Sequence, residues 1–195
     1  MLEIESANIV LFGNFNPYLI TPQWLKEQSI WAADDVQLAL GAMQQDGVQF
    51  HGDGSAWYVS SDSLVISSTK LDCGSVAVKI LEKLPHTPLT AVGSNFEFQD
   101  SSDSTQYPVF DEIRRTIPSE LNSQLLRWGT VIHEDDVRIE VTFLSGEQGT
   151  TIALGYRRSA SSIEMARRAA SRYGVDRDKS DLLIDQILGR KSGQC

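Results

Sequence analysis

The stretch "AWYVSSDSLVISST" (residues 56–69) predicts a β-hairpin and is the first indication of the fold. Its two arms are rich in aromatic and β-branched residues, and the polar Ser61–Ser63 segment between them contains residue types that favour turns. "VQFHG" (48–52) precedes the hairpin and has the composition of a further strand. Asp72 follows it and is a good N-cap for a helix over residues 74–84. We therefore expect successive strands that lead directly into a helix.

The second half of the chain predicts a similar arrangement. "VRIEVTFLS" (137–145) and "TTIALGYRR" (150–158) form a predicted hairpin joined across "GEQG". Two predicted helices follow, over residues 161–174 and 180–189, and Ser180 has the position of an N-cap for the second of them. Each half thus offers a hairpin followed by a helix, although the residues show no close internal repeat.

Two further strands are predicted near the start and the middle of the chain. "NIVLFGNF" (8–15) is apolar and rich in β-formers, and residues 87–99 have a similar character. Gly93 within the latter is expected to mark a bulge or a close approach of backbone. Thr21 followed by Pro22 predicts the start of a short helix, because this pair suits the N-cap and the first helical position.

Residues 32–47 are ambiguous, because residues that favour a helix occur together with an apolar alternation that suits a strand. We prefer the helix on the content of Ala, Leu, Met and Gln. Two more helices are predicted over residues 109–116 and 118–128.

This order of elements predicts an α+β fold. We expect an antiparallel or mixed sheet built from hairpins, with helices packed on it and a helical segment at the C-terminus. The length of 195 residues suits a single domain over residues 1–195. The alternative is a pair of lobes, residues 1–98 and 108–195, joined by a Ser- and Asp-rich loop at 99–107.

Composition and charge restrict the class of protein. The apolar content of 41% and charged content of 22% are those of an ordinary globular chain. The N-terminus lacks the pattern of a signal peptide, no apolar run is long enough to span a membrane, and the two cysteines lie far apart. We therefore expect a cytoplasmic protein that does not bind membranes.

The charge is unevenly distributed along the chain. Residues 1–154 carry 8 Lys or Arg and 21 Asp or Glu, whereas residues 155–195 carry 9 and 5. An acidic body with a net charge of −13 therefore precedes a basic segment with a net charge of +4. The overall charge of −9 argues against binding nucleic acid through the whole surface.

No short motif of catalysis or of cofactor binding occurs. The chain lacks a phosphate-binding loop, a dinucleotide-binding glycine pattern, a nucleophile elbow, a zinc-protease helix motif and an EF-hand loop. These absences favour a protein that is not an enzyme, and we expect no cofactor.

Two His/Asp pairs are the candidate residues for binding a ligand or a metal. His133 and Asp135 lie in "VIHEDDVRIEV" (131–141), where the same residues also suit a polar turn between two strands. His51 and Asp53 lie in a Gly-containing stretch that suits a tight turn as well. We favour a turn at both places.

The arginines of the C-terminal segment are the candidate residues for binding a partner. They are Arg157, Arg158, Arg167, Arg168 and Arg172. The leading hypothesis is a non-enzymatic interaction or accessory module that docks a protein partner, or a second copy of itself, through its basic C-terminal helices. A ligand-binding protein or a hydrolase-like enzyme using the cluster around His133 is the alternative, and nucleic-acid binding through these arginines is the third. The arginines could equally neutralise the acidic body of the same chain.

Overall fold

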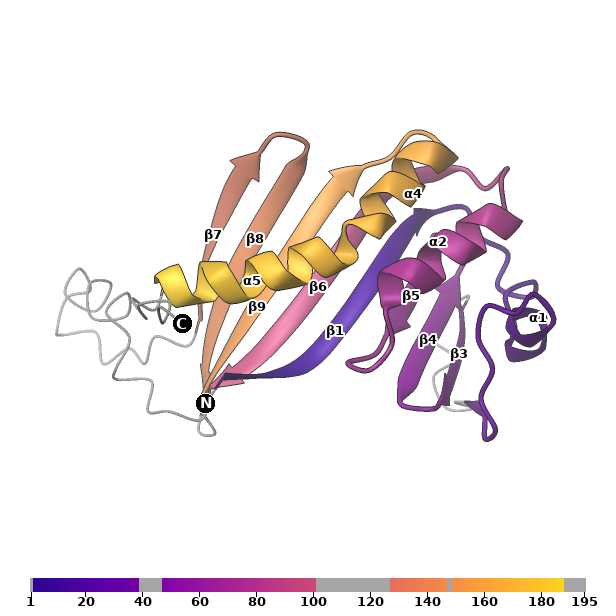
Figure 1. The fold of residues 1–195 in the computed structure, drawn as a ribbon, viewed down its shortest axis with the longest axis horizontal. Helices are drawn as coiled ribbons and strands as arrows, with labels where there is room; N and C mark the ends of the chain where they lie inside the picture. The colour runs from indigo at the N-terminus through magenta and orange to yellow at the C-terminus, as the bar shows by residue number, and fades with distance from the viewer. Residues whose placement is uncertain (1, 39–46, 101–126, 147–148, 188–195) are drawn as a thin grey trace, which may run out of the picture.

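A computed structural model describes residues 2–38, 47–100, 127–146 and 149–187, and these ranges form a nine-stranded antiparallel sheet with helices (Figure 1). The strands are β1 (Leu2–Gly13), β2 (Gln37–Leu38), β3 (Gly47–Gly52), β4 (Ser55–Ser60), β5 (Ser63–Ser67), β6 (Leu89–Asp100), β7 (Arg127–Glu134), β8 (Val137–Gly146) and β9 (Gly149–Ser159). The helices are α1 (Pro22–Glu27), α2 (Cys73–Lys83), α4 (Ile163–Ser171) and α5 (Tyr173–Ile187). The predicted α+β class is confirmed.

The strands lie in the order β2-β3-β4-β5-β1-β6-β9-β8-β7, and all neighbours are antiparallel. Strands from both sides of residues 101–126 therefore belong to one sheet, because β1 pairs with β6 and β6 pairs with β9.

The helices α2, α4 and α5 pack on one face of this sheet (Figure 1). Side chains alternate between the two faces of a strand, so the fully buried apolar side chains of β1, β8 and β9, with Phe96 and Phe98 of β6, lie on the face that carries these helices. Ile9, Phe96, Phe143 and Leu154 are examples, each with almost no exposed surface. No described helix packs on the opposite face, which we call the uncovered face.

An aromatic cluster closes the core beyond β5. Trp31 lies 5.3 Å from Trp57 and 6.0 Å from Phe50, measured between ring centroids, and the last two rings are stacked at 5.6 Å. Such pairs add to the burial of apolar area. The segment after α1 thereby covers β3 and β4, which lie away from the three larger helices.

Two of the three predicted caps, Thr21 and Asp72, and the two predicted hairpins are confirmed. Thr21 accepts the backbone N–H of Trp24 and begins α1, and Asp72 accepts the N–H of Ser75 and begins α2. The predicted hairpins correspond to β4–β5 and β8–β9. Of the polar turn expected over residues 133–136, only Asp135 and Asp136 connect β7 to β8, because His133 and Glu134 pair with Arg138 and Val137 at the end of β7.

Two predictions within strands are wrong. Residues 37–38 are the short strand β2 rather than part of a helix, because they pair with Phe50 and His51 at the edge of the sheet. Gly93 occupies a regular position opposite Val10, and the register shifts of the β1–β6 pair lie elsewhere, at Ile4/Ser6 and Phe12/Gly13. Pairing with distant strands overrode the local propensity in the first case.

Two predicted helix boundaries are also wrong. Ser180 is not an N-cap, because α5 already begins at Tyr173 and runs through it. The Ser180 hydroxyl instead donates to the Asp176 carbonyl inside the helix. Arg127 and Trp128, placed at the end of a predicted helix, belong to β7. The rest of that helix, the helix at 109–116, residues 39–46 and residues 101–107 of the predicted loop lie outside the described residues.

The sheet has an internal symmetry about the β1–β6 pair. Moving outward from β1, the strands are β5, β4 and β3, and moving outward from β6 they are β9, β8 and β7. On one side the chain runs through β3, β4 and β5 towards β1 and continues into α2. On the other side it runs through β7, β8 and β9 towards β6 and continues into α4. We call β1, β3–β5 and α2 the N-terminal repeat, and β6, β7–β9 and α4 the C-terminal repeat. Their helices α2 and α4 pack against one another.

Candidate functional site

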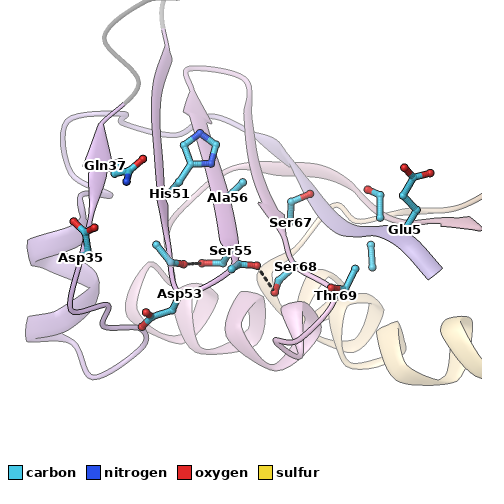
Figure 2. A pocket seen from close by; sticks show the side chains of 14 residues that line it. Glu5, Asp35, Gln37, His51, Asp53, Ser55, Ala56, Ser67, Ser68 and Thr69 are labelled. Carbon is cyan, nitrogen blue, oxygen red and sulfur yellow. Dashed lines mark hydrogen bonds between the residues drawn. The ribbon is translucent and has the colours of Figure 1, made fainter. Parts of the chain in front are cut away.

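The end of the β3–β4 hairpin forms a hollow of about 530 Å³, which we call the first hollow. Figure 2 shows Asp35 and Gln37 on one side of it and Glu5 on the other, with Ala56 and Ser67 between them. Glu5 lies at the register shift of β1, between Ile4 and Ser6. His51 and Asp53, both predicted from the sequence as ligand candidates, line this hollow together.

Local hydrogen bonds hold the turn of the first hollow. Asp53 and Gly54 have φ values of 48° and 69°, a left-handed conformation that Asp tolerates and Gly favours. The Ser55 hydroxyl donates to the Gly52 carbonyl at 2.7 Å, and the Ser68 hydroxyl donates to the Gly54 carbonyl at 3.0 Å (Figure 2). These contacts hold the turn, in which Asp53 occupies one of the two left-handed positions.

The end of the β7–β8 hairpin forms a second hollow of about 350 Å³, which contains the other predicted pair, His133 and Asp135. Asp135 has a φ of 47°, so it is again the residue that makes the turn possible. Arg138 and Arg157 are Cα partners on neighbouring strands and line this second hollow on the uncovered face.

The two hollows occupy equivalent places in the two repeats. The turn of β3–β4 is flanked by the pair Gly52/Ser55, and the turn of β7–β8 by Glu134/Val137. When these turns are superposed in register, every residue that lines the second hollow has a counterpart lining the first. The pairs are His51 and His133, Asp53 and Asp135, Gly54 and Asp136, Ser55 and Val137, Ala56 and Arg138, Ser67 and Arg157, and Thr69 and Ser159.

The helices support the same alignment. Ser67 is followed five residues later by the N-cap Asp72, and Arg157 is followed five residues later by the N-cap Ser162. Each cap side chain accepts the backbone N–H three residues on, from Ser75 in α2 and from Met165 in α4. The correspondence therefore extends from the hairpin turn to the helix start.

The two histidines cannot serve one site. Seven strand spacings of about 4.8 Å separate β3 from β7 along the sheet, which puts His51 and His133 on the order of 30 Å apart. Within the described residues, no group of three or more His, Cys, Asp or Glu side chains is arranged to hold a metal ion. The chemistry of each hollow must therefore come from its own lining.

The five candidate arginines do not form one surface. Arg157 lies on the uncovered face, whereas Arg158 points to the helices and forms a buried bidentate ion pair with Asp176 at 2.6 and 2.7 Å. Arg167 pairs with Glu82 of α2 at 2.6 Å. Arg168 and Arg172 are exposed on α4 and at its C-cap. Two of the five candidate arginines thus neutralise carboxylates of the same chain.

Sequence reasoning missed Arg138 and the pairing of the hollows. The signal was present in "HGDG" (51–54) and "HEDD" (133–136), which both place a histidine two residues before an aspartate at a hairpin turn. Cys73 does not add a nucleophile to either hollow. It is fully buried in α2, and this burial raises the pKa of its thiol above the ordinary value.

Comparison of the sequence with known proteins assigns no family. No protein-family model matches the chain, and no curated protein matches it. In the part of the chain that the structure describes, no helix combines the length and the apolar character needed to cross a membrane. Function is therefore inferred from the geometry of the two hollows and of the face on which they lie.

Proposed function

We propose that the protein is a non-enzymatic interaction module that docks a protein partner on the uncovered face of its sheet. The observation that carries this proposal is the recurrence of a His/Asp hollow at equivalent ends of both repeats. The aspartates are explained by their left-handed turn positions, but a strand position on the uncovered face makes no comparable demand for histidine. The recurrence of the two histidines therefore favours a role in binding.

The surface between the hollows suits contact with another protein. One cross-strand row runs through Tyr58, Val65, Val10 and Gly93 to Arg157. Tyr58, Val65 and Val10 are all partly exposed, so this row combines aromatic, aliphatic and arginine side chains. Aromatic residues and arginine are enriched where proteins bind each other.

The contacts of the C-terminal helices favour the sheet as the docking surface over these helices. The hypothesis that the C-terminal helices dock a partner requires positive side chains that are free to contact it. Arg158, Arg167 and Lys179 instead all pair with carboxylates of the chain, the last with Glu134. The proposal includes a reducing intracellular compartment, in keeping with Cys73, a buried free thiol.

The test compares two pairs of substitutions in the whole chain. Val65→Lys with Ala153→Lys alters the uncovered face, where both side chains are partly exposed. Arg168→Glu with Arg172→Glu alters the exposed surface of the C-terminal helices. Each variant is immobilised and exposed to lysate of the source cells at moderate salt, and circular dichroism verifies that it is folded.

We expect immobilised wild type to capture a partner protein from the lysate. The sheet variant should no longer capture this partner, whereas the helix variant should still capture it. The opposite pattern would place docking on the helices and would overturn the proposal. Retention by both variants, or no retained protein, would also contradict it.

A further inference from the structure

We infer that the second hollow binds a carboxylate of the partner through Arg138 and Arg157, and that the first hollow does not. This inference rests on the proposed function, because it names the chemistry by which one end of the uncovered face recognises an acidic segment of the partner.

The N-terminal repeat shows that the fold itself does not require these arginines. Their counterparts are Ala56 and Ser67, which are Cα partners in the same hairpin register. The same turn, the same strands and the same helix start are built around small side chains there. Two arginines at the equivalent places are therefore additions to the fold.

The two arginines repel each other as long as no anion is bound between them. Arg138 and Arg157 lie directly opposite one another on neighbouring strands, and like charges in that position repel. His133 lies opposite Arg138 on its other side, so the row of three contains no carboxylate. A local conflict of this kind is expected at functional or strained sites.

Contacts within the chain relieve this repulsion only in part. Arg138 pairs with Glu140 at 2.7 Å, but the two side chains are 48% and 54% exposed, so water weakens the attraction. Arg157 lies over the ring of Phe12, 4.9 Å from its centroid. Arg157 makes no ion pair with any carboxylate in the described ranges, and its guanidinium keeps hydrogen-bond donors for a ligand.

The Arg157 side chain passes over small residues of β6. Phe12 is on β1 and Arg157 on β9, so the side chain crosses β6, where Ala91 pairs with Phe12 and Gly93 pairs with Arg157. A Cβ at Gly93 would lie 3.6 Å from the Phe12 ring. At this distance an added Cβ would make an ordinary van der Waals contact, so the crossing accommodates small side chains.

A carboxylate fits this arrangement better than a cation does. Guanidinium groups bind carboxylates through parallel N–H donors, and Arg138 and Arg157 both line this hollow. Asp135 and Asp136 close the turn end of the hollow and repel an anion from there. The bound carboxylate therefore lies over Arg157, towards the middle of the sheet. The first hollow instead carries Glu5, Asp35 and Asp53 and repels the same group.

The probe for this inference is a fluorescein-labelled hexaglutamate peptide, and its binding to the whole protein is measured by fluorescence anisotropy. Arg138→Ala with Arg157→Ser installs the residues of the N-terminal repeat, which makes the variant compatible with the fold. Arg168→Ala with Arg172→Ala is the matched control, because it removes the same charge from the exposed helix surface.

The first variant should weaken peptide binding by roughly tenfold or more, and the control by less than about twofold. Inorganic phosphate should compete with the peptide, since it offers the same oxygen geometry. Equal losses in the two variants would show a non-specific charge effect and would overturn the inference, as would wild type that does not bind.

Partner capture separates this inference from the proposed function. Loss of peptide binding in the first variant, combined with capture that the sheet variant does not change, would keep the carboxylate site and reject the docking face. Capture that needs the uncovered face, without peptide binding by wild type, would keep the docking face and reject the carboxylate site.

Discussion

The two repeats share a backbone plan but differ in the side chains at its key positions. The outer hairpins, the turn aspartates and the helix caps correspond, whereas Ala56 and Ser67 of one repeat are replaced by two arginines in the other. The comparison teaches that hydrophobic alternation and turn chemistry determine the geometry. A few polar positions then decide what each end of the sheet can bind.

The residues that follow Ser67 and Arg157 also differ between the two repeats, and their side chains point into the core. Ser68 and Arg158 are equivalent and equally buried, at 7% exposure each. Ser68 meets its hydrogen-bonding needs locally, with the Gly54 carbonyl and the N–H groups of Lys70 and Leu71. Arg158 needs Asp176, which α5 supplies. Helix α5, which follows the C-terminal repeat, thus compensates a buried charge that the N-terminal repeat does not contain.

The largest expected effect comes from breaking that buried pair. Asp176→Ala should reduce the free energy of unfolding by about 3–5 kcal/mol, because it leaves the Arg158 guanidinium buried without a partner. Urea-induced unfolding measures this loss. Combining Asp176→Ala with Arg158→Ser, the residue of the other repeat, should recover part of it. A single-variant loss below about 1 kcal/mol would mean that the pair is solvated.

A smaller effect is expected where the helices of the two repeats meet. A Cβ at Gly74 of α2 would lie 2.5 Å from Tyr173 Cβ and 2.6 Å from the Ala170 carbonyl oxygen. Gly74→Ala should therefore cost about 1–3 kcal/mol of unfolding free energy, because backbone must move.

Gly174→Ala is the control for that substitution. Apart from its chain neighbours and the backbone of its own helix, no atom lies within 4 Å of a Cβ added at Gly174 in α5, so this change should stabilise the protein by up to about 1 kcal/mol through helix propensity. Destabilisation by both changes in thermal unfolding would argue against the described packing of α2 on the α4–α5 junction.

Ser68→Ala tests how much the hydrogen bonds of the buried Ser68 hydroxyl stabilise the N-terminal repeat. The change removes a hydroxyl that donates to Gly54 and accepts two backbone N–H groups, so it should cost about 1–2 kcal/mol. Urea-induced unfolding gives the value for comparison with Asp176→Ala. A cost as large as that of Asp176→Ala would remove the distinction drawn between the two repeats.

The last prediction concerns alkaline pH and Tyr156, the counterpart of Ile66. Burial raises the pKa of Tyr156 to about 12, above the ordinary value of 10. The folded state then holds the proton more tightly than the unfolded state does, so this contribution is complete below pH 10 and is lost as the pH rises towards 12. Tyrosinate absorbance should show late ionisation in wild type. Tyr156→Phe should remove that late component while Tyr173, whose pKa burial also raises, keeps its own.

Local sequence allowed much of the fold to be predicted, because caps and hairpins depend on residues close in the chain. Asp72 and Thr21 begin helices as expected, and the hairpins at 56–69 and 137–158 form where turn residues separate β-rich arms. The candidate site was reached only in part. His51, Asp53, His133 and Asp135 all line hollows, but Arg138 was absent from the prediction, because nothing local distinguishes it from any charged strand residue.

What the sequence by itself determined is the α+β class, the hairpins, the turn aspartates and the division of charge, all of which follow from short-range patterns. Tertiary structure alone decided the order of the strands, the strand state of residues 37–38, the role of Ser180 inside α5 and the partner of Arg158. It also decided the equivalence of the two hollows. These features depend on contacts between residues far apart in the chain, and such contacts are selected by packing and charge pairing across the whole sheet rather than by neighbouring residues.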